Sequence, residues 1–313
     1  MQPDQNTPPG LSVSIAGIRL GSPLVLASGI LGLTASSLRR IAEFGAGAVT
    51  TKSFGTRPRT GHKNPSIIPF DHGLLNAVGL SNPGMHVMQD EIMAYKRICH
   101  TPILASVFGG TIEDFSVVAE TAAAAEPDGI ELNVSCPNVR SEFGAPFGSS
   151  IKDTTTIVNS VRKRIGTIPL AVKLTVNCPS LATMARSCEE NGADIITAVN
   201  TVGPGMLIDY RTRKPILSNK TGGLSGPAMF PIAVRAVYEI YQEISIPIIG
   251  TGGVIRAEDA LQLIMAGATA VGIGSGIYYG GIEIISKINR DLDSLLKELG
   301  CRSLDEIRGV AHE

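Results

Sequence analysis

Eight short apolar runs recur along the 313-residue chain, and each ends in small or polar residues. The runs begin at Pro23, Ala46, Pro102, Gly129, Pro169, Ile195, Pro247 and Ala270. Segments with helical spacing lie between them, for example at 34–44, 111–124, 180–190, 227–242 and 257–265. Apolar strands that alternate with helices predict a parallel sheet covered by helices, and eight such units close a barrel. We therefore predict an α/β fold, a single (β/α)8 TIM barrel forming one domain over residues 1–313, rather than an open doubly wound sheet.

Two segments between runs are longer than a simple connection requires. Residues 51–83 follow the second run and contain Gly and Pro with little helical periodicity, and residues 203–226 follow the sixth run in the same way. Long connections in a compact fold usually cover a site. We therefore expect a long insertion after the second strand and an irregular loop after the sixth.

Charge and cysteine content exclude several classes of protein. The chain has 27 Lys and Arg against 28 Asp and Glu, so no strong field points to nucleic acid or anionic lipid. Its five cysteines contain no C-x-x-C pair, which argues against a disulfide framework and against a Cys-bound cluster. The start, MQPDQNTPPG, has no basic region before an apolar stretch, and no run of 18 apolar residues occurs. We expect a cytoplasmic protein with no metal site, no membrane span and no nucleic-acid partner.

The ends of the eight predicted strands carry polar groups. In an α/β barrel the active site lies at the carboxyl ends of the strands. None of these ends carries Asp or Glu, which favours an anionic ligand over metal-dependent hydrolysis. The turns GTGG from Gly250 and GIGSG from Gly272 each precede a predicted helix, and together they predict a phosphate site. The polar and glycine residues at the strand ends are Ser28, Lys52, Ser53, Ser106, Asn133, Cys136, Lys173, Asn200, Thr201, Gly252, Gly253, Gly274 and Ser275.

Lys173 and Cys136 are the candidates for chemistry. Lys173 lies within the apolar run AVKLT, so it is a snorkelling side chain, a Schiff-base lysine or a fixed positive charge facing an electron-rich ring. Cys136 follows Asn133 at a strand end that turns through Pro137. A thiol there is exposed enough to act as base or nucleophile, although free cysteines are most often small buried hydrophobes.

Several motifs resemble the class 1 dihydroorotate dehydrogenases over most of the chain, from Leu11 to about Tyr279. A thiol within NVSCPN is typical of class 1, whereas the membrane-bound class 2 enzymes have serine there and an additional N-terminal helical region. The matching motifs are ELNVSCPNV from Glu131, LLNAVGLSNPG from Leu74, VTTKS from Val49, PLAVKL from Pro169, AVNT from Ala198, GGLSGPA from Gly222 and IIGTGGV from Ile248.

The resemblance implies a barrel that binds FMN across its mouth. It places Lys173 near the N1–C2 edge of the flavin, where negative charge gathers on reduction. The phosphate would be held by Gly226, Gly252, Gly253, Gly274 and Ser275. The other residues implied to bind the cofactor are Ser28, Lys52, Ser53, Ser106, Asn133 and Val199.

The same resemblance implies dihydroorotate as substrate and orotate as product, in the synthesis of UMP. Amide side chains suit a planar pyrimidine-dione, and Lys52 can neutralise its carboxylate. Cys136 would remove the proton from C5 while hydride passes from C6 to N5 of the flavin. The residues implied to bind substrate are Lys52, Asn76, Ala77, Val78, Gly79, Leu80, Asn133, Asn138, Asn200 and Thr201.

The segment after the thiol indicates where the electrons go. Class 1A enzymes are homodimers that use fumarate and typically continue this loop with Pro-Gly-Lys-Pro, but this chain has NVRSEFGAPFG, closer to the NAD-linked class 1B pattern. Class 1B needs a second subunit with FAD and a 2Fe–2S cluster, for which this chain lacks the motifs. We expect a homodimeric core in a heterotetramer with that electron-transfer subunit.

Other interpretations stay open on sequence alone. Dihydropyrimidine dehydrogenases share the NxSCP loop, but they often have His where this chain has Asn138. A Schiff-base phosphosugar lyase would use Lys173, and a metabolite-binding subunit would not need Cys136. His62, His72 and His86 lie in or just after the first long segment without a spaced metal partner, so we expect them to lie in solvent.

Overall fold

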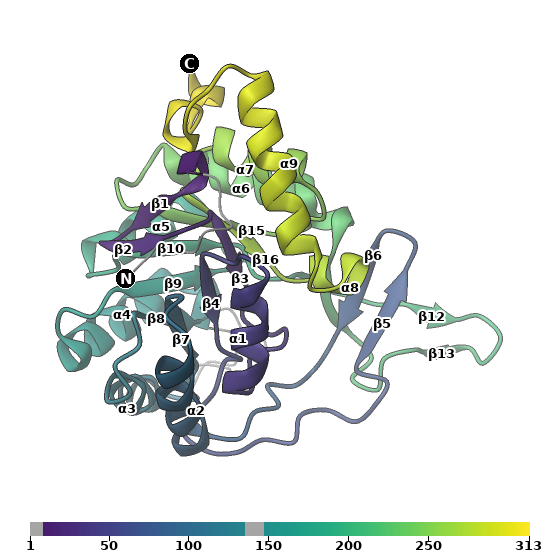
Figure 1. The fold of residues 1–313 in the computed structure, drawn as a ribbon. Helices are drawn as coiled ribbons and strands as arrows, with labels where there is room; N and C mark the ends of the chain where they lie inside the picture. Colours follow the sequence, from purple (N-terminus) through teal and green to yellow (C-terminus); the bar gives the residue numbers. More distant parts are fainter. Residues whose placement is uncertain (1–8, 135–146) are drawn as a thin grey trace.

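Eight parallel strands form a closed barrel in the computed structural model, which describes residues 9–134 and 147–313 (Figure 1). Each of the eight apolar runs supplies one strand, so the predicted barrel is confirmed. Around the barrel the order is β10-β15-β16-β3-β4-β7-β8-β9. The strands are β3 (Leu24–Leu26), β4 (Ala48–Thr50), β7 (Ile103–Val107), β8 (Gly129–Asn133), β9 (Leu170–Leu174), β10 (Ile195–Ala198), β15 (Ile248–Thr251) and β16 (Ala270–Ile273).

Helices surround the barrel and follow its strands (Figure 1). Several begin at a hydroxyl side chain that accepts a hydrogen bond from the helix's first turn, as Thr34, Thr111 and Ser180 do, which satisfies backbone N–H groups left unpaired there. The helices are α1 (Ala35–Glu43), α2 (Met85–Ile98), α3 (Ile112–Ala123), α4 (Ile151–Ile165), α5 (Leu181–Glu190), α6 (Phe230–Tyr241), α7 (Ala257–Met265), α8 (Gly276–Gly280) and α9 (Ile284–Glu298). Short 3-10 turns lie at Pro9–Leu11, Phe147–Ser149, Pro227–Met229, Leu304–Glu306 and Val310–His312.

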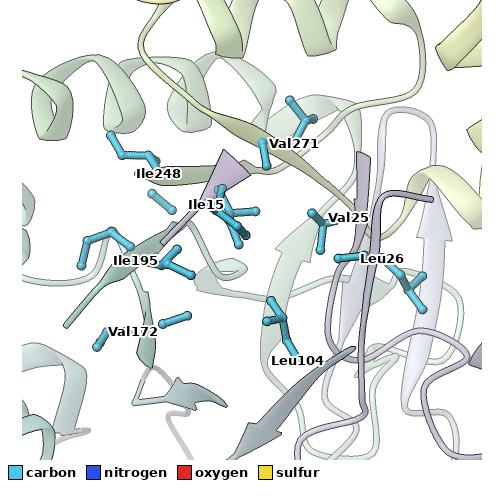
Figure 2. Close-up of a cluster of buried hydrophobic side chains, with 14 of the residues drawn as sticks. Ile15, Val25, Leu26, Leu104, Val172, Ile195, Ile248 and Val271 are labelled. Carbon is cyan, nitrogen blue, oxygen red and sulfur yellow. The ribbon is translucent and has the colours of Figure 1, made fainter. Parts of the chain in front are cut away.

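A hairpin near the start of the described chain packs against the barrel. Its strands β1 (Val13–Ile15) and β2 (Ile18–Leu20) alternate buried and exposed residues, and each strand turns its apolar side chains inward. Figure 2 shows Ile15 among apolar side chains of the barrel strands, including Val25, Leu104 and Ile195. Because this end of the barrel is filled with apolar side chains, the polar chemistry lies at the other end, where the strands end.

The two long connections form regular structure that their sequences did not reveal. Residues 51–83 contain β5 (Ile67–Phe70) and β6 (Gly73–Asn76), and the later connection contains β11 (Val202–Gly205) and β14 (Gly222–Ser225). These strands join in one sheet of order β11-β14-β6-β5. A further hairpin of β12 (Ile208–Asp209) and β13 (Lys214–Pro215) extends away from the barrel (Figure 1). The expected long insertion after the second barrel strand is confirmed, and the connection after the sixth, expected to be irregular, contains short strands separated by loops and turns.

Candidate functional site

A chain of hydroxyl groups crosses the barrel mouth. The Oγ atom of Ser28, just after β3, lies 2.7 Å from the Oγ atom of Ser53, just after β4. Ser53 Oγ in turn lies 2.9 Å from Ser106 Oγ on β7. Ser53 and Ser106 are almost fully buried, whereas Ser28 is half-buried. The carboxyl ends of adjacent parallel strands meet at one edge, which brings together three residues distant in sequence.

Two asparagines extend this network across the barrel. Asn133, at the end of β8, donates from Nδ2 to Ser53 Oγ at 3.0 Å. Its Oδ1 atom accepts from Asn200 Nδ2 at 3.2 Å, and Asn200 Oδ1 accepts from the backbone N–H of Thr201 at 2.8 Å. Sequence reasoning predicted all of these side chains, and the structure connects them by hydrogen bonds.

Lys173 lies inside the barrel and not at its surface. It belongs to β9, its side chain is 6% exposed, and its Nζ atom lies 3.9 Å from Glu131 Oε1. Burying an ammonium group is costly unless a carboxylate or hydrogen bonds compensate. The snorkelling interpretation is therefore wrong, because the charge stays in the interior beside a carboxylate.

Glu131 is the site residue that sequence reasoning missed. The strand ends carry no carboxylate, but Glu131 lies two residues before Asn133 on β8 and is 2% exposed. Since side chains alternate along a strand, it points to the same side as Asn133, into the barrel. A charged residue at an inward position of the apolar strand GIELN was the signal that could have identified it. The expectation of a site without carboxylates was wrong in this respect.

The glycine turns after the last two barrel strands lie close together. Gly252 and Gly253 have positive φ angles of 143° and 76°. A Cβ atom at Gly253 would lie 2.9 Å from the carbonyl oxygen of Gly226, and one at Gly276 would lie 2.6 Å from the carbonyl oxygen of Val254. These close approaches require glycine, and they bring the turns after β14, β15 and β16 side by side.

Gly274 differs from these glycines because its surroundings are open. A Cβ atom there would meet only Ala27 Cβ among the described residues, at 3.6 Å, and no positive φ angle requires glycine. Gly274 is half-buried and precedes Ser275, which caps α8. A glycine that the protein itself does not require is typical of a position where a ligand approaches the backbone. The space above Gly274 and the three joined turns fit a phosphate group.

The predicted substrate residue Asn76, at the end of β6, faces the connection after β10. Asn76 donates from Nδ2 to the carbonyl oxygen of Gly223 on β14 at 3.2 Å. A Cβ atom at Gly223 would lie 2.2 Å from Thr201 Oγ1, so only glycine lets Thr201 and Asn76 approach the same point of β14. The inserted sheet therefore positions two of the predicted residues together.

The backbone from Ala77 to Leu80 packs against His62. Gly79 and Leu80 have positive φ angles, and a Cβ atom at Gly79 would lie 2.7 Å from the backbone nitrogen of His62. His62 is half-buried, its N–H donates to Val78 O at 3.0 Å, and its Nδ1 lies 3.1 Å from Ala77 O. His62 therefore supports this segment instead of lying in solvent, whereas His72 and His86 are exposed as expected.

The remaining predicted residues divide into two groups. Val199 is buried after β10, and Lys52 is half-buried with its backbone N–H bonded to Gly32 O at 2.8 Å. Cys136 and Asn138 lie outside the described residues. Among the described cysteines, burial raises the pKa of the Cys188 thiol to about 12 and also raises the pKa of Cys178, so neither thiol is predisposed to ionise.

Residues 9–134 and 147–313 contain no group of three or more His, Cys, Asp or Glu that could hold a metal ion. No helix in the part of the chain that the structure describes is long and apolar enough to cross a membrane.

The structure defines an α/β barrel with hydrogen-bonded polar side chains at its mouth and adjacent glycine turns after its last two strands. A family model described as dihydroorotate dehydrogenase matches residues 10–296. Since this match covers most of the sequence, the chain belongs to the dihydroorotate dehydrogenase family, and the family prediction is confirmed.

Individual relatives align with nearly the full length of this chain. Proteins named dihydroorotate dehydrogenase B (NAD(+)), catalytic subunit, are 44% identical in Methanothermobacter thermautotrophicus (97% of this chain, 99% of the relative) and 44% identical in Methanocaldococcus jannaschii (97% and 98%). The protein of that name from Pyrococcus abyssi is 40% identical over 96% of this chain and 99% of its own. The resemblance to the NAD-linked type is therefore also confirmed.

Proposed function

We propose that this chain is the catalytic subunit that oxidises dihydroorotate to orotate in the synthesis of UMP. The observation that carries the proposal is the continuous network at the barrel mouth, in which Ser28, Ser53, Ser106, Asn133 and Asn200 are joined by hydrogen bonds beside Lys173. The network supplies donors and acceptors to a planar ligand, and family membership supplies the reaction class.

We propose FMN as the cofactor. Gly226, Gly252, Gly253, Gly274 and Ser275 would hold its phosphate, because the turns that carry them lie side by side and leave room above Gly274. Ser28, Ser53, Ser106, Asn133, Val199, Lys52 and Lys173 would line its ring. When bound, FMN supplies the acceptor for the hydride that leaves C6 of the substrate.

The proposed substrate site uses amides and one lysine. Asn76, Asn133, Asn138, Asn200 and Thr201, with the backbone from Ala77 to Leu80, would hydrogen-bond the edges of the pyrimidine ring. The Lys52 ammonium group would bind the carboxylate. His62 would act indirectly, because it holds the 77–80 segment in place.

We propose Cys136 as the base that takes the proton from C5. An ordinary thiol titrates at about 8.5, so turnover should rise with pH through that region. Family membership supports this role for Cys136, and substitution of the thiol tests it.

We also propose a separate electron-transfer subunit with FAD and a 2Fe–2S cluster, and NAD as the final acceptor. The relatives from three archaea are named catalytic subunits of an NAD(+) enzyme, which supports a partner. The catalytic chain would form the homodimeric core of a heterotetramer in the cytoplasm.

The absorbance spectrum of the purified protein tests the proposal directly. We expect flavin bands that bleach when dihydroorotate is added without oxygen, and bands that persist when orotate is added instead. A colourless protein that borohydride traps covalently with a phosphosugar would favour a Schiff-base lyase at Lys173. A bound flavin that dihydroorotate leaves oxidised would contradict the proposed substrate.

A further inference from the structure

Glu131 is a buried carboxylate at the centre of the polar network. Its side chain is 3% exposed and starts from β8, between the strands that carry Ser106 and Lys173. Oε1 accepts a hydrogen bond from Ser106 Oγ at 2.9 Å and lies 3.9 Å from Lys173 Nζ. Oε2 accepts from Thr197 Oγ1 on β10 at 3.1 Å. The carboxylate therefore ties four neighbouring barrel strands together beneath the mouth.

These contacts determine the direction of the hydrogen bonds above them. An ionised carboxylate only accepts, so Ser106 must use its single hydroxyl hydrogen toward Glu131. Ser106 must then accept from Ser53, because their Oγ atoms are 2.9 Å apart. Ser53 has no second hydrogen, so it accepts from Ser28 Oγ and from Asn133 Nδ2.

The direction of these hydrogen bonds determines what Ser28 and Asn133 can offer to a ligand. Ser28 donates its hydrogen to Ser53, so only oxygen lone pairs remain for a ligand in the mouth. Asn133 must turn its Nδ2 toward Ser53, which leaves Oδ1 to accept from Asn200. A carboxylate that does not itself reach the mouth thus sets which groups there accept.

We infer that Glu131 is a positioning residue that holds the Lys173 ammonium group in place and orients the hydroxyl chain from Ser106 to Ser28. This inference deepens the proposed function, and the test with bound FMN rests on that function. Beside a bound flavin, the negative charge of Glu131 would partly offset the positive charge of Lys173. The pair would hold the site nearly neutral and limit how strongly Lys173 favours the reduced flavin.

The ion pair is tested first without any cofactor, by a double-mutant cycle on the apoprotein. Glu131→Gln and Lys173→Met should each lower the melting temperature, because each removes one member of a buried ion pair and keeps the charge of the other. The double variant leaves no buried charge of this pair, so it should melt closer to the parent than either single variant. Additive losses, or a double variant that does not fold, would overturn the inference.

The charge of Glu131 is tested next through the midpoint potential of bound FMN. Glu131→Gln keeps the shape of the side chain and removes its charge, so the flavin near Lys173 should be easier to reduce. We expect a tenfold change in the two-electron equilibrium constant, which corresponds to a rise of about 30 mV. A role in folding alone would not move this potential.

Asp194→Asn is the matched control for the potential. Asp194 also forms an ion pair, with Arg162, but it precedes β10 and lies at the opposite end of the barrel. The control variant should bind FMN with the parent's potential. An unchanged or lowered potential in Glu131→Gln would overturn the inference. If neither the parent nor any variant bound FMN, the proposed function would fail instead, and the apoprotein cycle would still decide whether the ion pair exists.

Discussion

Ser53 is central to the hydrogen-bond network at the barrel mouth, because its hydroxyl contacts Ser28, Ser106 and Asn133. Replacing it by alanine would remove one hydrogen bond from each of these partners, and Ser53 and Ser106 are buried. We expect Ser53→Ala to lower the free energy of unfolding of the apoprotein by about 1–3 kcal/mol. Urea unfolding measures the change, and Ser294→Ala on the exposed face of α9 is the control. Equal stability of the two variants would show that the hydroxyl chain contributes nothing.

Cys136 offers a sharper test of chemistry at the residue scale. Cys136→Ala removes the proposed base but no group proposed to hold FMN. We expect turnover of dihydroorotate to fall by roughly 10²–10⁴-fold, the usual contribution of a general base, while the flavin stays bound. Anaerobic reduction of the bound flavin, followed by absorbance across pH, measures the rate. Rates equal to those of the parent at every pH would contradict the assignment.

The buried thiol of Cys188 predicts a loss of stability in alkali. Burial raises its pKa to about 12 in the folded protein, from 9.0 when unperturbed. Between these values only the unfolded chain loses the proton, so the unfolded state gains stability as pH rises. The free energy of unfolding should fall by about 1.4 kcal/mol per pH unit through this group.

Cys188→Ala should remove that part of the pH dependence. The variant also loses packing at neutral pH, so each protein is compared with its own stability at neutral pH. Urea unfolding between about pH 10 and about pH 11 should then show a loss about 1.4 kcal/mol larger in the parent. Parallel pH profiles would show that the thiol ionises as easily in the folded protein as in the unfolded chain.

At the scale of elements, the turn between β16 and α8 allows ligand binding to be tested separately from folding. Gly274→Ala places a methyl group where the protein has space, so the apoprotein should melt like the parent. If the phosphate of FMN approaches this backbone, its dissociation constant should rise tenfold or more, which is about 1.4 kcal/mol or more. Equilibrium titration with FMN measures the change.

Gly21→Ala is the control for this turn. Among the described residues, a Cβ atom at Gly21 would meet nothing within 4 Å, but Gly21 precedes β3 at the other end of the barrel. This variant should bind FMN like the parent. Unchanged FMN affinity in Gly274→Ala would place the phosphate elsewhere.

The barrel elements could be predicted because their signals are local. Each strand is a short apolar run, and α7 was predicted over its observed residues, Ala257–Met265. The polar site residues followed, because parallel strands end at one edge and bring Ser28, Ser53 and Ser106 together whatever their separation in sequence. The division into a single domain stays a prediction.

The inserted sheet could not be predicted in the same way. Strand β6 pairs with β14, so Leu74 lies opposite Ser225 across about 150 residues of chain. β14 consists of the residues GGLS, which carry little strand propensity, and it pairs with β11 of the same connection and with the distant β6. Glu131 was missed for a different reason. It lies two residues before the end of β8, at an inward position, and the prediction considered only the strand ends.

At the scale of the whole molecule, the two ends of the barrel have different tasks. The hairpin of β1 and β2 packs apolar side chains near one end, and the inserted sheet lies beside the other. An apolar base holds the strands rigidly, which keeps the hydroxyl and amide groups at the mouth within hydrogen-bond distance. The long connections contribute Asn76 and Thr201 from two elements joined by β14.

The proposed partner subunit predicts how the isolated chain behaves toward electron acceptors. The sequence has no complete motif for a second flavin or an iron–sulfur cluster beside the proposed FMN site, so alone the chain should reduce an artificial dye with dihydroorotate but not NAD. Adding the electron-transfer subunit should establish NAD reduction. Steady-state assays with dye, NAD and fumarate, with and without the partner, measure this. Turnover with fumarate by the lone chain would contradict the NAD-linked assignment, because it would show that this subunit passes its electrons on without a partner.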